Sequence, residues 1–238
     1  MTGSGLLLAG LGVATGLATL AGGFLALRLS DRTHLILGFS AGAVVGVALL
    51  DLLPECIQLG GPGHEQRIAS FIAAGFILYL VVDRALLALS GGNTSHRGHF
   101  GAASLTAHSF LDGLGIGLGF QASAAVGAVL AAAVLAHDFA DGINTVNLSL
   151  SGSRNPIFAR RWLAADALAP LLGIGASALF RLPHATLAGV LALFAGFFLY
   201  IGASELLPES HHRHPRATTT MAAAAGVILI GAVVRLAG

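Results

Sequence analysis

Long apolar runs separated by short polar breaks make up almost the whole chain. A membrane-crossing helix needs about 20 predominantly apolar residues. The candidate runs cover 5–27, 35–53, 68–89, 102–120, 124–150, 162–180, 185–207 and 218–236. Because the breaks are short, the pattern predicts eight transmembrane helices in a single domain over 1–238. The first run lacks a preceding basic region and is too long for a signal peptide, so we interpret it as a membrane helix.

The composition supports this interpretation. Hydrophobic residues make up 55% of the chain and charged residues only 10%, whereas about 25% of the residues in a soluble domain are charged. We therefore expect an all-α polytopic membrane protein whose surroundings are the lipid bilayer. The chain has no basic stripe, so we expect no nucleic-acid partner. The 33 glycines favour close helix packing and permit a homodimer without requiring one.

The arginines predict an orientation, because cytoplasmic loops are enriched in basic residues. Nine arginines lie in the loops after odd-numbered predicted helices or at the helix ends beside these loops, and three lie on the opposite side. The first set is Arg28, Arg32, Arg84, Arg97, Arg154, Arg160, Arg161, Arg213 and Arg216; the second is Arg67, Arg181 and Arg235. This ratio predicts that the first set is cytoplasmic and that both termini lie outside. The short chain favours a bacterial inner membrane.

Two sequence repeats share one symmetry. The second and seventh runs end in Leu-Leu-Pro-Glu, each preceded by an acid, at 51–55 and 205–209. The fourth and fifth runs each contain His-x-Phe-x-Asp-Gly, at 108–113 and 137–142. In both pairs the helices are predicted to cross the membrane in opposite directions. The chain therefore fits a 3+2+3 inverted repeat, the plan of many alternating-access transporters.

The second repeat brings histidine and aspartate together. Residues four apart share a helix face, so His108 lies beside Asp112 and His137 beside Asp141. If the two helices face each other, all four side chains meet at one point. Two imidazoles and two carboxylates without a thiolate suit zinc, iron(II), manganese or cadmium.

The energetic cost of buried acids also favours a cation. Six acids fall within the predicted spans: Asp51, Asp112, Asp138, Asp141, Asp166 and Glu205. Unpaired at the centre of a membrane, they would cost on the order of 15 kcal/mol together. The chain contains no lysine to compensate them. A divalent metal ion or protons would do so.

Further polar residues predict a second site beside the first. Asp138 follows His137 directly and points about 100° around its helix, and Ser109 has the same place after His108. Asp141 could bridge the two sites. Asp166, in the sixth run, can reach the same region. We therefore include Ser109, Asp138 and Asp166 among the candidate metal ligands.

These motifs resemble those of the Zrt/Irt-like protein (ZIP) family of divalent metal transporters. In that family, helix 4 carries His-Asn-x-x-acid-Gly and helix 5 carries His/Gln-acid/Asn-x-Pro-Glu-Gly. The Leu-Leu-Pro-Glu endings look similar as well. The resemblance implies that His108, Asp112, His137 and Asp141 form the main transport site. It also implies that Asp138 and Asp141 contribute to the second site.

The chain departs from the family pattern at four positions. Ser109 replaces the usual asparagine, Ala140 the usual proline, and Asp141 a glutamate. Ala169 stands before Pro170 where the family usually has glutamate, and Asp166 lies three residues earlier. These changes leave the first site complete and reduce the second.

The sequence thus predicts a transporter that moves divalent metal ions, zinc foremost, into the cytoplasm by alternating access. The metal is the transported substrate, so no resident cofactor and no enzymatic activity are expected. Two alternatives stay open at this point. An intramembrane zinc-dependent hydrolase would also bury histidine and aspartate around a metal-activated water. A proton-coupled carrier of small solutes would use the His–Asp pairs as proton relays.

Overall fold

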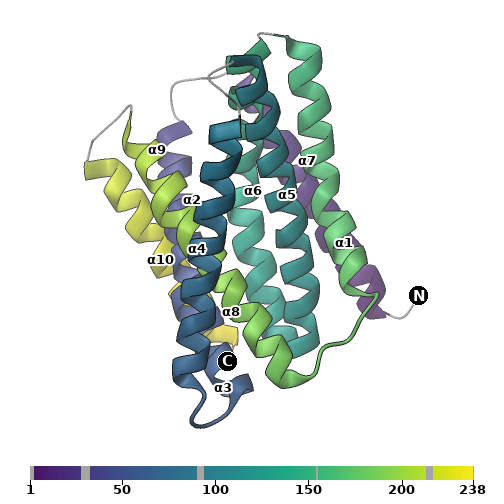
Figure 1. Ribbon diagram of the computed structural model, residues 1–238, viewed down its shortest axis with the longest axis vertical. Coiled ribbons are helices and arrows are strands. Elements are labelled where there is room, and N and C mark those ends of the chain that lie inside the picture. The colour runs from purple at the N-terminus through teal and green to yellow at the C-terminus, as the bar shows by residue number, and fades with distance from the viewer. Residues whose placement is uncertain (1–2, 28–32, 90–93, 154, 213–216, 238) are drawn as a thin grey trace. The chain divides into compact units, whose positions relative to one another are not determined.

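The described residues are 3–27, 33–89, 94–153, 155–212 and 217–237, and helices make up nearly all of them in the computed structural model (Figure 1). Six helices are uninterrupted: α1 (Gly3–Ala26), α4 (Glu65–Leu89), α5 (Thr94–Ala122), α6 (Ala124–Ser153), α7 (Pro156–Ser177) and α10 (Ala217–Ala237). Two are composite, joining α2 (Thr33–Val47) through η1 (Ala48–Leu52) to α3 (Leu53–Gly60), and α8 (His184–Tyr200) through η2 (Ile201–Leu206) to α9 (Leu207–His212). This architecture confirms the predicted all-α fold.

Six of these helices, within the described ranges, are long and apolar enough to cross a membrane: α1, both composite helices, α4, α6 and α10. The chain is thus a multi-pass membrane protein. The predicted spans at 102–120 and 162–180 fall in α5 and α7, which are more polar. Five arginines used to predict the orientation, Arg28, Arg32, Arg154, Arg213 and Arg216, lie outside the described residues.

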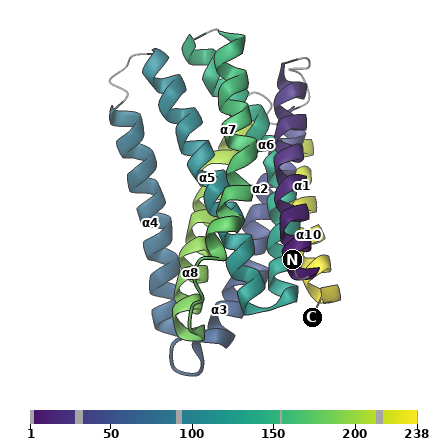
Figure 2. The same ribbon diagram turned by 90° about the vertical axis from the view of Figure 1, so that its right-hand side faces the viewer.

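The chain divides into two compact units that interleave along the sequence. Unit 1 comprises Met1–Asp31, Val81–Gly117 and Asp138–Leu179, and unit 2 comprises Arg32–Leu80, Leu118–His137 and Phe180–Gly238. The prediction of one domain over 1–238 stays a prediction. Within unit 1, α1 packs on α7, and within unit 2, α10 packs along α2. In unit 2, α3 also packs on α8, and Figure 2 shows these two helices side by side.

Glycines bring α1 and α6 into backbone contact in unit 1. A Cβ at Gly142 would collide with the carbonyl oxygen of Thr19, and a Cβ at Gly22 with that of Phe139. Small residues at such crossings let membrane helices approach closely, where lipid provides no hydrophobic drive for association. Gly142 is the last residue of the second His-x-Phe-x-Asp-Gly motif, so this contact lies one residue beyond Asp141.

The first copy of the motif makes the equivalent contact with α7. A Cβ at Gly113 would collide with the carbonyl oxygen of Pro170, and a Cβ at Gly173 with that of Phe110. Each motif glycine therefore holds a neighbouring helix against the helix that carries the histidine and aspartate. The glycine of this repeated motif therefore has a packing role, in addition to the chemical role of the histidine and aspartate.

In unit 2, the two helices that carry the Leu-Leu-Pro-Glu repeats make similar glycine contacts with their neighbours. Gly42 of α2 and Gly226 of α10 each lie against the other helix's backbone, as do Gly196 of α8 and Gly75 of α4. Gly42 and Gly196 occupy equivalent places, nine residues before Asp51 and Glu205 respectively. The two repeat copies therefore pack in equivalent ways on their neighbours.

Both composite helices widen to a π-helix at the repeated acidic residue. Asp51 lies in η1 and Glu205 in η2, and each π-helix is followed within two residues by proline, Pro54 or Pro208. A proline lacks the N–H that a helix interior requires, but it is tolerated in a first turn. The helix therefore continues beyond the proline, to Gly60 in one copy and to His212 in the other. The predicted ends at 53 and 207 are too early.

Candidate metal site

Helix α5 places one histidine and one aspartate in contact. His108 Nε2 lies 3.1 Å from Asp112 Oδ2, at the i,i+4 spacing of the motif. Both side chains are almost fully buried. The predicted pairing is therefore present, and its cause is local helix geometry.

Helix α6 provides the other histidine and aspartate, His137 and Asp141, one turn apart on a continuous helix. His137 Nδ1 lies 2.9 Å from the carbonyl oxygen of Ala133, one turn earlier. Because a carbonyl oxygen only accepts, Nδ1 carries the proton and Nε2 keeps the lone pair that a metal needs. The edge of the same imidazole meets the ring of Phe198, with centroids 6.0 Å apart.

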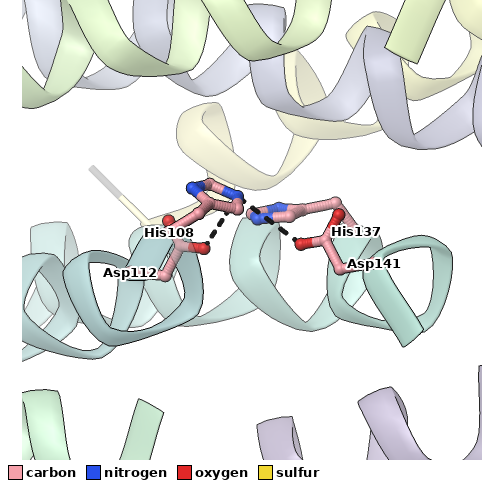
Figure 3. A group of neighbouring side chains, drawn as sticks. All are labelled: His108, Asp112, His137 and Asp141. Atoms are coloured by element: carbon pink, nitrogen blue, oxygen red, sulfur yellow. Dashed lines mark ion pairs between the residues drawn. The ribbon is translucent and has the colours of Figure 1, made fainter. Parts of the chain in front are cut away.

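The four side chains point toward one another (Figure 3). One ligand atom from each of His108, Asp112, His137 and Asp141 lies within 4.8 Å of the other three. His108 Nε2 lies 3.5 Å from Asp141 Oδ2. Ligands around a tetrahedral zinc ion are separated by about 3.4 Å, given bonds of about 2.1 Å. The separations of 3.1 and 3.5 Å are close to that value, and any longer ones, which reach at most 4.8 Å, would have to contract when an ion binds.

Asp138 is fully buried, and neither carboxylate oxygen has a hydrogen-bond partner among the described residues. Asp112, Asp141 and Asp166 are close enough for their charges to act on it. Asp138 is not part of the four-residue group, so its predicted role in a second site stays a prediction. A buried carboxylate in this state requires a proton or a cation.

Ser109 and Asp166, the other two predicted ligands, contact each other. Ser109 Oγ donates to Asp166 Oδ1 at 2.7 Å, and Thr145 Oγ1 donates to Asp166 Oδ2 at 2.7 Å. All three residues are completely buried. The sequence indicated that Asp166 reaches this region, and the structure adds the hydrogen bond from Thr145.

Ser40 is a residue near the site that sequence reasoning missed. Its Oγ donates to the carbonyl oxygen of Ala136, the residue before His137, at 2.8 Å. This bond links α2 to α6 within unit 2. A single serine in an apolar helix carries no pattern, and nothing in the sequence pointed to this contact.

Comparison with known proteins identifies several relatives. The chain is 27% identical to the zinc transporter ZIP13 of Pongo abelii in an alignment of 188 residues that covers 73% of this chain and 57% of that protein. It is 24% identical to zinc transporter ZIP13 of Mus musculus in an alignment of 225 residues that covers 75% of this chain and 62% of that protein. It is 25% identical to zinc transporter YKE4 of Saccharomyces cerevisiae in an alignment of 225 residues that covers 78% of this chain and 64% of that protein.

The chain spans about three fifths of the length of these relatives. No protein-family model matches it. The similarity nevertheless extends over most of the chain and agrees with the motif resemblance found in the sequence.

Proposed function

Because the chain is a divergent relative of the ZIP transporters, we propose that it carries divalent transition-metal ions across a membrane. Zinc is the foremost candidate, and iron, manganese and cadmium are further candidates because they accept the same imidazole and carboxylate ligands. His108, Asp112, His137 and Asp141 bind the ion during transport. The bilayer and the divalent ion are its partners in this role.

The observation that carries the proposal is the buried group of two imidazoles and two carboxylates. Two carboxylates balance the charge of one divalent ion, which removes most of the cost of burying them. The Nδ1 proton of His137 is bonded to the carbonyl of Ala133, so Nε2 is the nitrogen through which this imidazole would bind the ion. The donor set suits borderline metals better than calcium or magnesium, which favour oxygen ligands alone.

The mode of transport is also part of the proposal. The equivalent packing of the two repeat copies supports alternating access. The arginine distribution supports an orientation with both termini outside. Uptake into the cytoplasm across the cell membrane is the direction that we propose. Asp138, Ser109 and Asp166 stay predictions as ligands of a second ion.

Zinc uptake into proteoliposomes tests the proposal. The purified protein is reconstituted with a zinc-sensitive dye trapped inside, and uptake is compared between the parent, His108→Ala, Asp141→Ala and His184→Ala. His184 is an exposed histidine at the start of α8 and serves as the matched control. We expect both site variants to lose uptake and the control to keep it. Uptake at the parent rate by both site variants would refute the assignment.

The same preparation discriminates the two alternative functions. A proton-coupled carrier of small solutes would keep its activity after complete chelation of metals. A hydrolase would turn over a substrate without moving zinc. Because the relatives are named transporters, we expect neither result.

A further inference from the structure

The carboxylate of Asp166 joins three helices of unit 1. It projects from α7 and accepts one hydrogen bond from α5, through Ser109, and one from α6, through Thr145. Each of its two oxygens is used once, at 2.7 Å, a length typical of strong O–H···O⁻ bonds. We call these three residues the Asp166 clamp.

The clamp excludes water and is satisfied as it stands. Ser109, Thr145 and Asp166 are each 0% exposed. A hydroxyl has a single hydrogen to donate, and both hydroxyls give theirs to Asp166. The contrast with Asp138 is direct, because that equally buried carboxylate has no hydrogen-bond partner among the described residues.

The surrounding backbone brings Asp166 to this position. Gly113 and Gly173 allow α5 and α7 to touch along their backbones, so a short side chain on α7 can reach α5. Pro170 follows Asp166 by four residues and lacks an N–H, which leaves the carbonyl of Asp166 without its usual helical donor. The missing bond permits a bend of α7 at this turn.

The clamp connects the two ligand-bearing helices close to the ligands. Ser109 follows His108 directly, and Thr145 lies one turn beyond Asp141. Ligand positions must hold to about 0.2 Å for good metal coordination. A carboxylate that is hydrogen-bonded to both helices constrains their spacing next to the metal ligands.

We propose that Asp166 is a positioning residue of the metal site, which fixes α5 against α6 through Ser109 and Thr145, and is not itself a ligand. The inference rests on the proposed function, since it concerns the same site. To bind a second ion, Asp166 would have to give up hydrogen bonds that the structure shows to be formed. A ligand role and a positioning role therefore predict different metal stoichiometries.

Zinc binding to the purified full chain in detergent tests the proposal, by isothermal titration and by metal analysis after dialysis. The variants are Thr145→Val, which keeps the shape and removes the hydroxyl, Thr145→Ser, which keeps the hydroxyl, and Asp166→Asn. We expect Asp166→Asn to bind the same number of zinc ions per chain as the parent. We expect Thr145→Val to weaken zinc binding about 10-fold or more, as loss of a ligand-orienting contact does, and Thr145→Ser to restore it.

A double variant adds a readout that general destabilisation would not reproduce. If Thr145 acts through Asp166, adding Thr145→Val to Asp166→Asn should weaken binding little further. Loss of one zinc per chain in Asp166→Asn would overturn the proposal in favour of a ligand. Parent-like affinity in Thr145→Val, or equal weakening in Thr145→Val and Thr145→Ser, would also overturn it.

The His108→Ala variant separates this proposal from the proposed function. If His108→Ala binds as much zinc as the parent, the metal site and its clamp are both refuted. If His108→Ala abolishes binding while Thr145→Val matches the parent, only the clamp is refuted.

Discussion

Replacing Gly142 by alanine should force α1 and α6 apart. The new Cβ would collide with the carbonyl oxygen of Thr19 and would also approach the backbone nitrogen of Gly23. Close carbon–oxygen contacts between helices usually lie at about 3.3–3.6 Å. Reaching that distance would require the two backbones to separate by about 1.5 Å, because neither contact atom belongs to a side chain that can rotate away.

The expected cost follows from this geometry. Overpacking by one methyl group costs about 1–3 kcal/mol, and alanine returns about 1 kcal/mol through its higher helix propensity. We expect a net loss of about 2 kcal/mol, because the obstacle is backbone. For a chain of this length, that loss corresponds to a melting temperature about 4–8 °C lower.

The assay is thermal unfolding in detergent and chelator, followed by size-exclusion chromatography of heated samples. Gly175→Ala in α7 is the matched control, because a Cβ there meets nothing within 4 Å. It should melt at the parent temperature or slightly above. If Gly142→Ala is as stable as Gly175→Ala, the close contact between α1 and α6 is wrong.

Three further predictions concern the site. Zinc at 100 times its Kd should stabilise the parent by about 2.7 kcal/mol, and His108→Ala should lose this stabilisation in the same melting assay. Zinc affinity should fall by at least about tenfold between pH 7.5 and pH 5.5, because the metal needs neutral imidazoles and ionised carboxylates. Titration calorimetry at the two pH values measures this affinity, and equal affinities would contradict the assigned ligands. Asp138→Asn should raise the melting temperature in chelator, since it removes a buried carboxylate without hydrogen-bond partners; a lower melting temperature would contradict that reading of Asp138.

The number and order of the helices could be predicted from the sequence, because the bilayer sets a length that apolar runs reveal. Their ends were harder. The run ending at 53 continues to Gly60, since Pro54 lies in the first turn of α3 and interrupts nothing there. Likewise, α5 begins at Thr94, within a polar stretch that hydropathy alone assigns to a break.

The site was predictable where it depended on a single helix. The contact of His108 with Asp112 follows from their spacing, as does the shared turn of His137 and Asp141. The bond between Ser109 and Asp166 depends on how α7 packs on α5, and sequence periodicity does not encode that register. The link from Ser40 to Ala136 is similarly a product of packing.

The π-helices change the rotational phase of the chain beyond them. An α-helix turns 100° per residue, so one residue accommodated in a wider turn rotates everything that follows by about that angle. Asp51 and Cys56, five residues apart across the end of η1, are both buried, although such a spacing places residues about 140° apart in a regular α-helix. Deleting Leu50 would remove the extra residue together with the wide turn, so Cys56 should stay buried, whereas deleting Leu53, beyond η1, should turn the thiol of Cys56 away from the interior by about 100°. Cys56 is the chain's single cysteine, so its reaction with a thiol reagent would register the phase of the whole second helix.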